Sequence, residues 1–258
     1  MISNRLLNII FGVSTLLTSL LFGCSADKII ARKVSKEFKD NDIIQQYQVG
    51  FALYNLGEKK MIFEKDADKY FTPASNTKLY TFFASLKMIP EVMPALRYIE
   101  KNDSLIFWGT GDPSFLQFNV KDKSAYNFLQ SSTKKLFFAP GRYSGTFFGD
   151  GWAWDDYDFY YQPEITELPI MDNMVTSSYV NPNKINIVPK VFAHCFTIDS
   201  TKTSGNFQVT RNFLTNDFHY PAVAVKPNYN QQNPYKTSPQ TTVEILSDQI
   251  NTARMDLD

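Results

Sequence analysis

The chain has 258 residues, 43% of them hydrophobic, which is enough for a buried core in one large domain or two smaller ones. Lys plus Arg and Asp plus Glu are equal at 26 each, so the formal net charge is zero and no nucleic-acid-binding surface is expected. The high aromatic content, 22 Phe and 14 Tyr, is typical of a strand-rich protein or of one with sugar- or peptide-binding surfaces.

Residues 1–23 read as a secretory signal, with one Arg followed by an apolar stretch that only small polar residues interrupt. The stretch ends in Leu-Phe-Gly-Cys, which resembles the lipobox of bacterial lipoproteins, where the cysteine becomes the lipidated first residue of the mature chain. We therefore expect a protein of the periplasm or cell envelope, anchored to the membrane through lipid on Cys24. A plain signal peptide cut nearby, or an uncleaved anchor, is the alternative.

The second cysteine, Cys195, has no partner for a disulfide if Cys24 is lipidated. It follows His194, which raises the question of a metal site or a cysteine nucleophile. Two adjacent residues are not a ligand set, and His219 is the only other histidine. A buried structural cysteine is therefore favoured.

The mature chain begins with a polar and charged segment over 24–44, expected to be a tether that can include a short helix. A hairpin follows, with a first strand over 49–56, a turn over 57–59 and a second strand from Met61.

"TPASNTKLYTFFASLKMI" then predicts a helix, with Thr72 as N-cap and Pro73 at the first helical position. The apolar residues recur at helical spacing; they are Leu79, Phe82, Phe83 and Leu86.

Short strand-like runs separated by Gly, Pro, Asn and Asp follow after about residue 100, which predicts mostly antiparallel sheet. Among these runs are "DSLIFWG", "KKLFFAPG" and "RYSGTFFGD". The last stretch, "TTVEILSDQINTARMDLD", is expected to be helical and gives no signal for a helix C-terminus.

Ser75 and Lys78 are three residues apart, so a helix places them side by side near its first turn. The Ser75 amide has no partner inside the helix there and can point at an anion. Partial burial beside the apolar residues would favour the neutral amine of Lys78, which can accept the hydroxyl proton. The pair then supplies a nucleophile, a base and half of an oxyanion hole.

Ser-x-x-Lys is a weak signal by itself, because it occurs three more times, at Ser25, Ser131 and Ser132. Only Ser75 follows a hairpin and opens an amphipathic helix. The alternative is that Ser75 and Lys78 form an ordinary first-turn pair.

Four segments in order resemble the D-alanyl-D-alanine carboxypeptidase/endopeptidase family of low-molecular-mass penicillin-binding proteins. "PASNTKL" resembles the family's nucleophile motif. "WGTGDPSF" resembles its Gly-Gly-Gly-Asp-Pro-Thr-Leu stretch, and "GDGWAWDDYDFYYQPEITELPIMDN" its Gly-Trp-x-Trp-Asp-Asp region. "YKTSPQ" resembles its Ser-Pro-Pro-Leu segment. The resemblance covers about 45–245.

The resemblance implies an α+β fold, with part of a transpeptidase domain, an antiparallel sheet flanked by helices, that carries an inserted β-rich domain. The implied boundaries are 45–100 for the first part of the catalytic domain, 101–232 for the insert and 233–258 for the return. It also implies that Ser75 attacks the bond between two D-alanines of the peptidoglycan stem peptide while Lys78 accepts its proton. β-Lactams would acylate the same serine, and no metal or cofactor is needed.

Two further motifs of the family, Ser-x-Asn and Lys-Thr-Gly, have no credible match. Ser204-Gly205-Asn206 overlaps Lys202-Thr203-Ser204, and one serine cannot serve both. Lys236-Thr237-Ser238 is followed by Pro239, which has no N–H to donate at the oxyanion position. We therefore expect a C-terminally truncated family member that is at most feebly active alone.

The stretch from 151 to 164 combines six aromatic residues with Asp155, Asp156 and Asp158. It can be a carbohydrate or peptide platform, a glycosidase carboxylate pair, or a packed loop whose carboxylates cap turns, and the last is favoured. For the whole chain, the alternative to a serine peptidase is a non-catalytic envelope lipoprotein that binds peptidoglycan or a protein partner.

Overall fold

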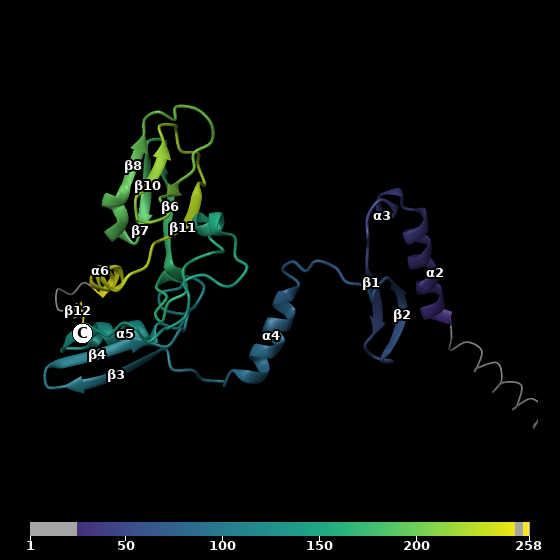
Figure 1. Cartoon of the computed structure of the whole chain (residues 1–258), viewed down its shortest axis with the longest axis horizontal. Coiled ribbons are helices and arrows are strands. Elements are labelled where there is room, and N and C mark those ends of the chain that lie inside the picture. The colour runs from purple at the N-terminus through teal and green to yellow at the C-terminus, as the bar shows by residue number, and fades with distance from the viewer. Residues whose placement is uncertain (1–24, 251–254, 258) are drawn as a thin grey trace, which may run out of the picture. The chain divides into compact units, whose positions relative to one another are not determined.

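The computed structural model describes residues 25–250 and 255–257 of the chain. The chain divides into two compact units, Met1–Met88 and Ile89–Asp258. Residues 1–23 and Cys24 lie outside the described residues, so the expected signal and lipidation site stay predictions. The predicted domain boundaries near 100 and 232 also stay predictions. They are a different division from that into compact units, which falls after Met88. Figure 1 shows the elements of both units.

The first unit opens with two helices, α2 (Ser25–Asp40) and α3 (Asp42–Gln45). The segment predicted as a tether is therefore helical over most of its length. The Asn41 side chain ends α2 and starts α3, because its Oδ1 accepts the Ile43 and Ile44 amides at 3.0 and 3.1 Å. α2 is also fixed to the hairpin, since Asp27 pairs with Lys60 at 2.6 Å.

The predicted hairpin is confirmed as β1 (Phe51–Asn55) and β2 (Lys60–Lys65), which pair antiparallel. In its turn Lys59 has a positive φ of 53°, and the Glu58 amide donates a hydrogen bond to Asn55 Oδ1. The core of the unit is a small aromatic cluster. Phe38 of α2 lies 5.1 and 5.7 Å from the rings of Phe51 and Phe63.

The helix predicted from Thr72 begins five residues later, as α4 (Thr77–Met88). Asn76 Oδ1 accepts the Ala74 amide at 2.8 Å, and the Thr77 amide bonds back to the Ala74 carbonyl at 3.1 Å. These local bonds hold the chain in a tight turn before the regular helix starts.

The second unit contains three sheets, described by the order of their strands. The first sheet has the order β12-β5-β4-β3, with β3 and β4 antiparallel and the pairs β4–β5 and β5–β12 parallel. Its strands are β3 (Leu96–Lys101), β4 (Ser104–Gly109), β5 (Lys135–Phe138) and β12 (Met255–Leu257). Helices α5 (Ser124–Ser131) and α6 (Pro239–Ile250) lie beside this sheet (Figure 1).

The other two sheets have the orders β11-β6-β7 and β8-β10-β9. Their strands are β6 (Met174–Asn181), β7 (Lys184–Val188), β8 (Phe196–Asp199), β9 (Thr210–Arg211), β10 (Phe218–Pro221) and β11 (Asn230–Pro234). Two short 3₁₀ helices, η1 (Trp154–Asp158) and η2 (Met171–Asn173), precede β6, and a third, η3 (Lys190–Cys195), connects β7 to β8. Most pairings between described strands are antiparallel, as predicted, but β8 and β10 run parallel, as do β4–β5 and β5–β12 of the first sheet.

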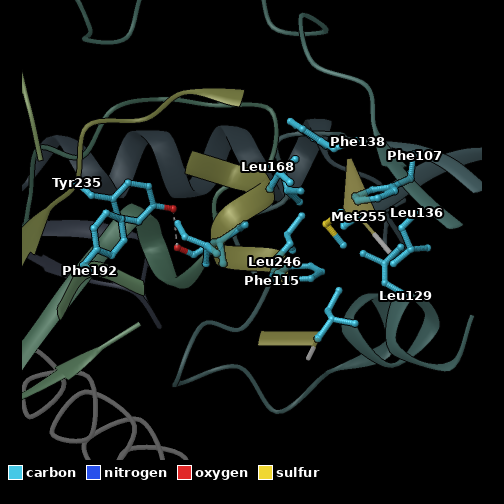
Figure 2. Packing of buried hydrophobic residues seen from close by; sticks show 14 of the residues in the cluster. Phe107, Phe115, Leu129, Leu136, Phe138, Leu168, Phe192, Tyr235, Leu246 and Met255 are labelled. Atoms are coloured by element: carbon cyan, nitrogen blue, oxygen red, sulfur yellow. Dashed lines mark hydrogen bonds between the residues drawn. The ribbon is translucent and has the colours of Figure 1, made fainter. Parts of the chain in front are cut away.

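One hydrophobic core joins the sheets of the second unit. Figure 2 shows Tyr235 and Phe192 at one end of the cluster, with Phe107, Leu136 and Phe138 at the other. Tyr235 is fully buried, and its hydroxyl lies 2.9 Å from Asn173 Oδ1. Burial of this kind raises the pKa of the Tyr235 phenol far above its ordinary value.

Two predicted elements are wrong in this unit. Residues 142–150 form no strand, because the Glu167 carboxylate takes the Gly141 and Tyr143 amides at 2.9 and 3.2 Å. The helix expected to the end of the chain stops at Ile250, and β12 follows it into the first sheet. No helix among the described residues is long and apolar enough to cross a bilayer.

Replacing Gly109 with alanine is expected to destabilise the second unit by about 3 kcal/mol, because a Cβ there would lie 2.0 Å from the Glu167 carbonyl oxygen. Backbone of the 109 or 167 segment would have to move. Urea unfolding followed by circular dichroism measures the change. Gly57→Ala is the control, because its Cβ would meet its nearest atom at 3.4 Å. Equal loss in both variants would contradict the close approach at Gly109.

Candidate active site

The side chains of Ser75 and Lys78 meet at the entry to α4. Lys78 Nζ donates to Ser75 Oγ across 3.0 Å. Three consecutive backbone bonds between residues three apart form the turn that brings them together, among them the Lys78 amide to the Ser75 carbonyl at 3.1 Å. The contact predicted from a helical first turn is thus made by a tighter turn with the same three-residue spacing.

The expected burial of Lys78 is absent, because all residues from 71 to 80 are exposed. α4 contains no buried residue, and its predicted apolar face is open, with Leu79 71% exposed and Phe82 63% exposed. What the structure does show is that the Ser75 hydroxyl and the Lys78 amine lie within hydrogen-bonding distance of each other.

The amide of Ser75 makes no hydrogen bond to any residue that the structure describes, whereas those of Ala74, Thr77 and Lys78 are used within the turn. An N–H ahead of a helix N-terminus is oriented for an anion by the helix dipole. Ser75 thus combines a hydroxyl that contacts an amine with an unused donor on the same residue.

Lys236 and Thr237, considered above for a Lys-Thr-Gly role, are held by a buried carboxylate that sequence reasoning missed. Glu164 has a side chain only 3% exposed. It accepts Lys236 Nζ at 2.5 Å and the Thr237 amide at 2.9 Å. The only sequence signal was an acidic residue inside the apolar-rich run "PEITELPI". This ammonium is therefore committed to a structural ion pair.

The other candidate, residues 202–206, lies in an exposed irregular segment after β8 and not on a strand. Lys202 pairs with Asp199 at 3.5 Å, and its carbonyl accepts the Ala222 amide at 2.9 Å. A Lys-Thr-Gly role needs a strand edge beside the nucleophile, which this segment does not provide.

Cys195 lies at the end of η3 and is half-buried, with its Sγ 3.4 Å from His194 Nε2. Burial raises the pKa of the Cys195 thiol, which reduces its thiolate fraction and makes it a poor nucleophile. His219 lies instead opposite Thr197, with 3.5 Å between Nδ1 and Oγ1. No cluster of three or more metal-ligating side chains occurs within residues 25–250 and 255–257.

The segments "WGTGDPSF" and "ELPIMDN", far apart in sequence, meet around Glu167. The Glu167 carbonyl accepts the Gly111 amide at 2.7 Å, where Gly111 has a φ of 82°. Arg142 stacks on Trp108 of the first segment, 4.8 Å from its centroid. A hollow of ≈ 490 Å³ opens between these segments, and both Glu164 and Glu167 line it.

The aromatic-acidic stretch is partly packed and partly open. Tyr157 donates to the Arg211 carbonyl at 2.8 Å, and Asp158 Oδ1 accepts Asn233 Nδ2 at 2.9 Å. Burial raises the pKa of Asp158. Burial, and then the hydrogen bond to Asp156, raise the pKa of Tyr161. Tyr157 and Asp158 are thus held against neighbouring segments, as in a packed loop, whereas Trp154 and Tyr160 are exposed.

Comparison with known families gives one match. The model of a family described as D-Ala-D-Ala carboxypeptidase 3 (S13) matches residues 30–218 of the chain, which include Ser75, Lys78 and the first three segments quoted above. No curated protein matches the chain.

Comparison with solved structures finds penicillin binding protein 4 (dacB) from Haemophilus influenzae, with a TM-score of 0.54 and 14% identity. The match covers 81% of this chain and 52% of that one. The same protein complexed with a novel β-lactam matches with a TM-score of 0.52, over 84% of this chain and 53% of that one. At 14% identity the likeness establishes the fold alone, and the chain spans about half the length of these structures.

Proposed function

This chain belongs to the D-Ala-D-Ala carboxypeptidase 3 (S13) family, and from that premise we propose that it is a serine peptidase of the cell wall that is acylated at Ser75. One observation carries the proposal. The amine of Lys78 is already in hydrogen-bonding contact with the hydroxyl of Ser75, at 3.0 Å. A nucleophile and a base within such a distance are the parts that acyl transfer needs.

In the proposed reaction Ser75 Oγ attacks the carbonyl carbon between two D-alanines of a peptidoglycan stem peptide. Its proton moves to Lys78 Nζ in the neutral form and then to the leaving amine as the C–N bond breaks. The amide of Ser75, which has no partner among the described residues, would donate to the developing oxyanion. Water then cleaves the ester, releases the shortened peptide and restores the hydroxyl.

We expect the chain to react slowly, because neither of the two Lys-Thr candidates supplies a second oxyanion donor. Pro239 has no N–H, and Lys236 is paired with Glu164. Losing one oxyanion donor costs about 10²–10³ in rate.

A fluorescent penicillin tests the proposal, because the β-lactam carbonyl is attacked by the same hydroxyl. Slow covalent labelling of the purified chain is expected, with the label on the peptide containing Ser75 by mass spectrometry. Ser75→Ala should remove the label, while Ser131→Ala, in another Ser-x-x-Lys, should keep it. Labelling that persists in Ser75→Ala, or no labelling at all, would show the proposal to be wrong.

The cell location is proposed on the same basis, as a lipoprotein of the periplasmic envelope with residues 1–23 as signal and Cys24 as the lipidated residue. A second function, non-catalytic binding of peptidoglycan, is favoured by the exposure of Ser75 and Lys78. Sedimentation with purified sacculi separates the two functions. A binder should be retained equally by wild type and Ser75→Ala and should not be labelled by penicillin.

A further inference from the structure

A second hollow in the 89–258 unit is not used by the reaction above. It encloses ≈ 730 Å³ between η1, the residues that follow it, β9 and β11. This volume falls in the usual range of small-molecule sites, about 300–1,000 Å³. Its lining contains four aromatic residues, three of them notably exposed: Phe118 is 74%, Tyr160 65% and Phe159 46% exposed.

Hydrogen bonds hold the base of this hollow in place. Gln231 on β11 accepts the Val209 amide at 2.9 Å and also the Tyr229 hydroxyl at 2.7 Å. Asp158 is held by Asn233 at 2.9 Å. Because these polar groups are already bonded to one another, the shape of the hollow is formed before any ligand arrives.

The rim, in contrast, has polar side chains with unused hydrogen-bonding capacity. Asp155, Gln208 and Asn230 are exposed, and within the described residues their side chains make no hydrogen bond or ion pair. Two carboxamides and a carboxylate beside the exposed Tyr160 ring supply both donors and acceptors around an aromatic face. Hydroxyl-rich rings with C–H faces match such a surface, since partly positive C–H groups stack on the negative face of an aromatic ring.

The charge of the lining discriminates against ligands that carry carboxylates. It includes Asp155 and Asp158 and no Lys, Arg or His. The nearest cation, Arg211, lies behind the lining and is 3% exposed, with its guanidinium bonded to carbonyls such as that of Pro234 at 2.8 Å. A peptide with a free C-terminus would meet no counter-charge there.

We propose that this hollow binds a neutral oligosaccharide of β-linked N-acetylated amino sugars, with one sugar ring stacked on Tyr160 and its polar groups bonded to Gln208 and Asn230. As the glycan strand of peptidoglycan has this chemistry, the site would hold the strand whose stem peptide Ser75 attacks. The assignment of the ligand to peptidoglycan rests on the proposed function, whereas the binding of the sugar itself does not.

Calorimetric titration of the Ser75→Ala chain with the tetramer of β-1,4-linked N-acetylglucosamine tests the site independently of catalysis. Saturable binding is expected. Tyr160→Ala should weaken it about fivefold to tenfold, and Gln208→Ala should weaken it as well. Tyr70→Ala is the matched control, because Tyr70 is a fully exposed tyrosine of the other unit and its removal should leave the affinity unchanged.

The outcomes separate the alternatives. Absence of saturable binding, or equal affinity in wild type and in a normally folded Tyr160→Ala, would overturn the proposal; a thermal melt checks the fold. If Tyr160→Ala weakens the binding of acetyl-Lys-D-Ala-D-Ala and not that of the saccharide, the hollow is a peptide site and the saccharide assignment is wrong. Penicillin labelling of the wild-type chain is measured separately, so failure of the serine mechanism leaves this result intact.

Discussion

Replacing Lys78 with methionine is expected to lower the rate of penicillin acylation by about 10²–10⁴-fold, the usual contribution of a general base. Methionine keeps the length of the side chain and removes the amine that contacts Ser75 Oγ at 3.0 Å. Because the pair lies on the surface, the stability of the chain should change little. The rate of covalent labelling at a fixed penicillin concentration is the measurement.

Lys87→Met is the matched control for this experiment, as Lys87 is an exposed lysine of the same helix whose amine lies over the Phe83 ring. It should acylate at the wild-type rate. A wild-type rate in Lys78→Met would show that Ser75 is activated by some other group.

Glu164→Ala is expected to destabilise the 89–258 unit by about 3 kcal/mol. The change removes a buried carboxylate and leaves Lys236 Nζ and the Thr237 amide without their acceptor. Breaking a buried ion pair by removing one partner typically costs about 3–5 kcal/mol. We expect the lower end of that range, because the Lys236 side chain is 33% exposed and its charge can be partly hydrated.

Urea unfolding followed by tryptophan fluorescence measures this effect, because Trp108, Trp152 and Trp154 all lie in that unit. Glu244→Ala removes an exposed carboxylate of α6 and should change stability by less than about 0.5 kcal/mol. The double variant Glu164→Leu, Lys236→Met should recover much of the loss, since neither charge remains. A Glu164→Ala protein as stable as wild type would mean that solvent replaces the ion pair at no cost.

The sequence predicted the parts of the molecule that depend on neighbouring residues. The hairpin of β1 and β2 follows from alternating apolar residues around a short polar turn. Ser75 and Lys78 meet because residues at positions i and i+3 lie side by side in a helical turn. The family and its α+β fold were also correctly predicted, because four motifs appear in order. The roles of Ser75 and Lys78 stay a prediction.

What the sequence could not predict depends on partners distant in the chain. The burial expected for Lys78 assumed a surface against the apolar side of α4, and helical periodicity does not say whether one exists. Residues 142–150 have strand-like composition, yet Glu167 takes the Gly141 and Tyr143 amides. Glu164 was missed for the same reason, as its partners lie more than seventy residues away.

The exposed segment 200–206 has a consequence for the integrity of the chain. It contains Lys202, an accessible cleavage point for trypsin, yet β8 before it and β9 after it both pair with β10. Farther along, Val209 is fully buried and Arg211 is bonded to the Pro234 carbonyl. A nick at Lys202 would therefore leave two fragments that separate on a denaturing gel but stay together, folded, in solution.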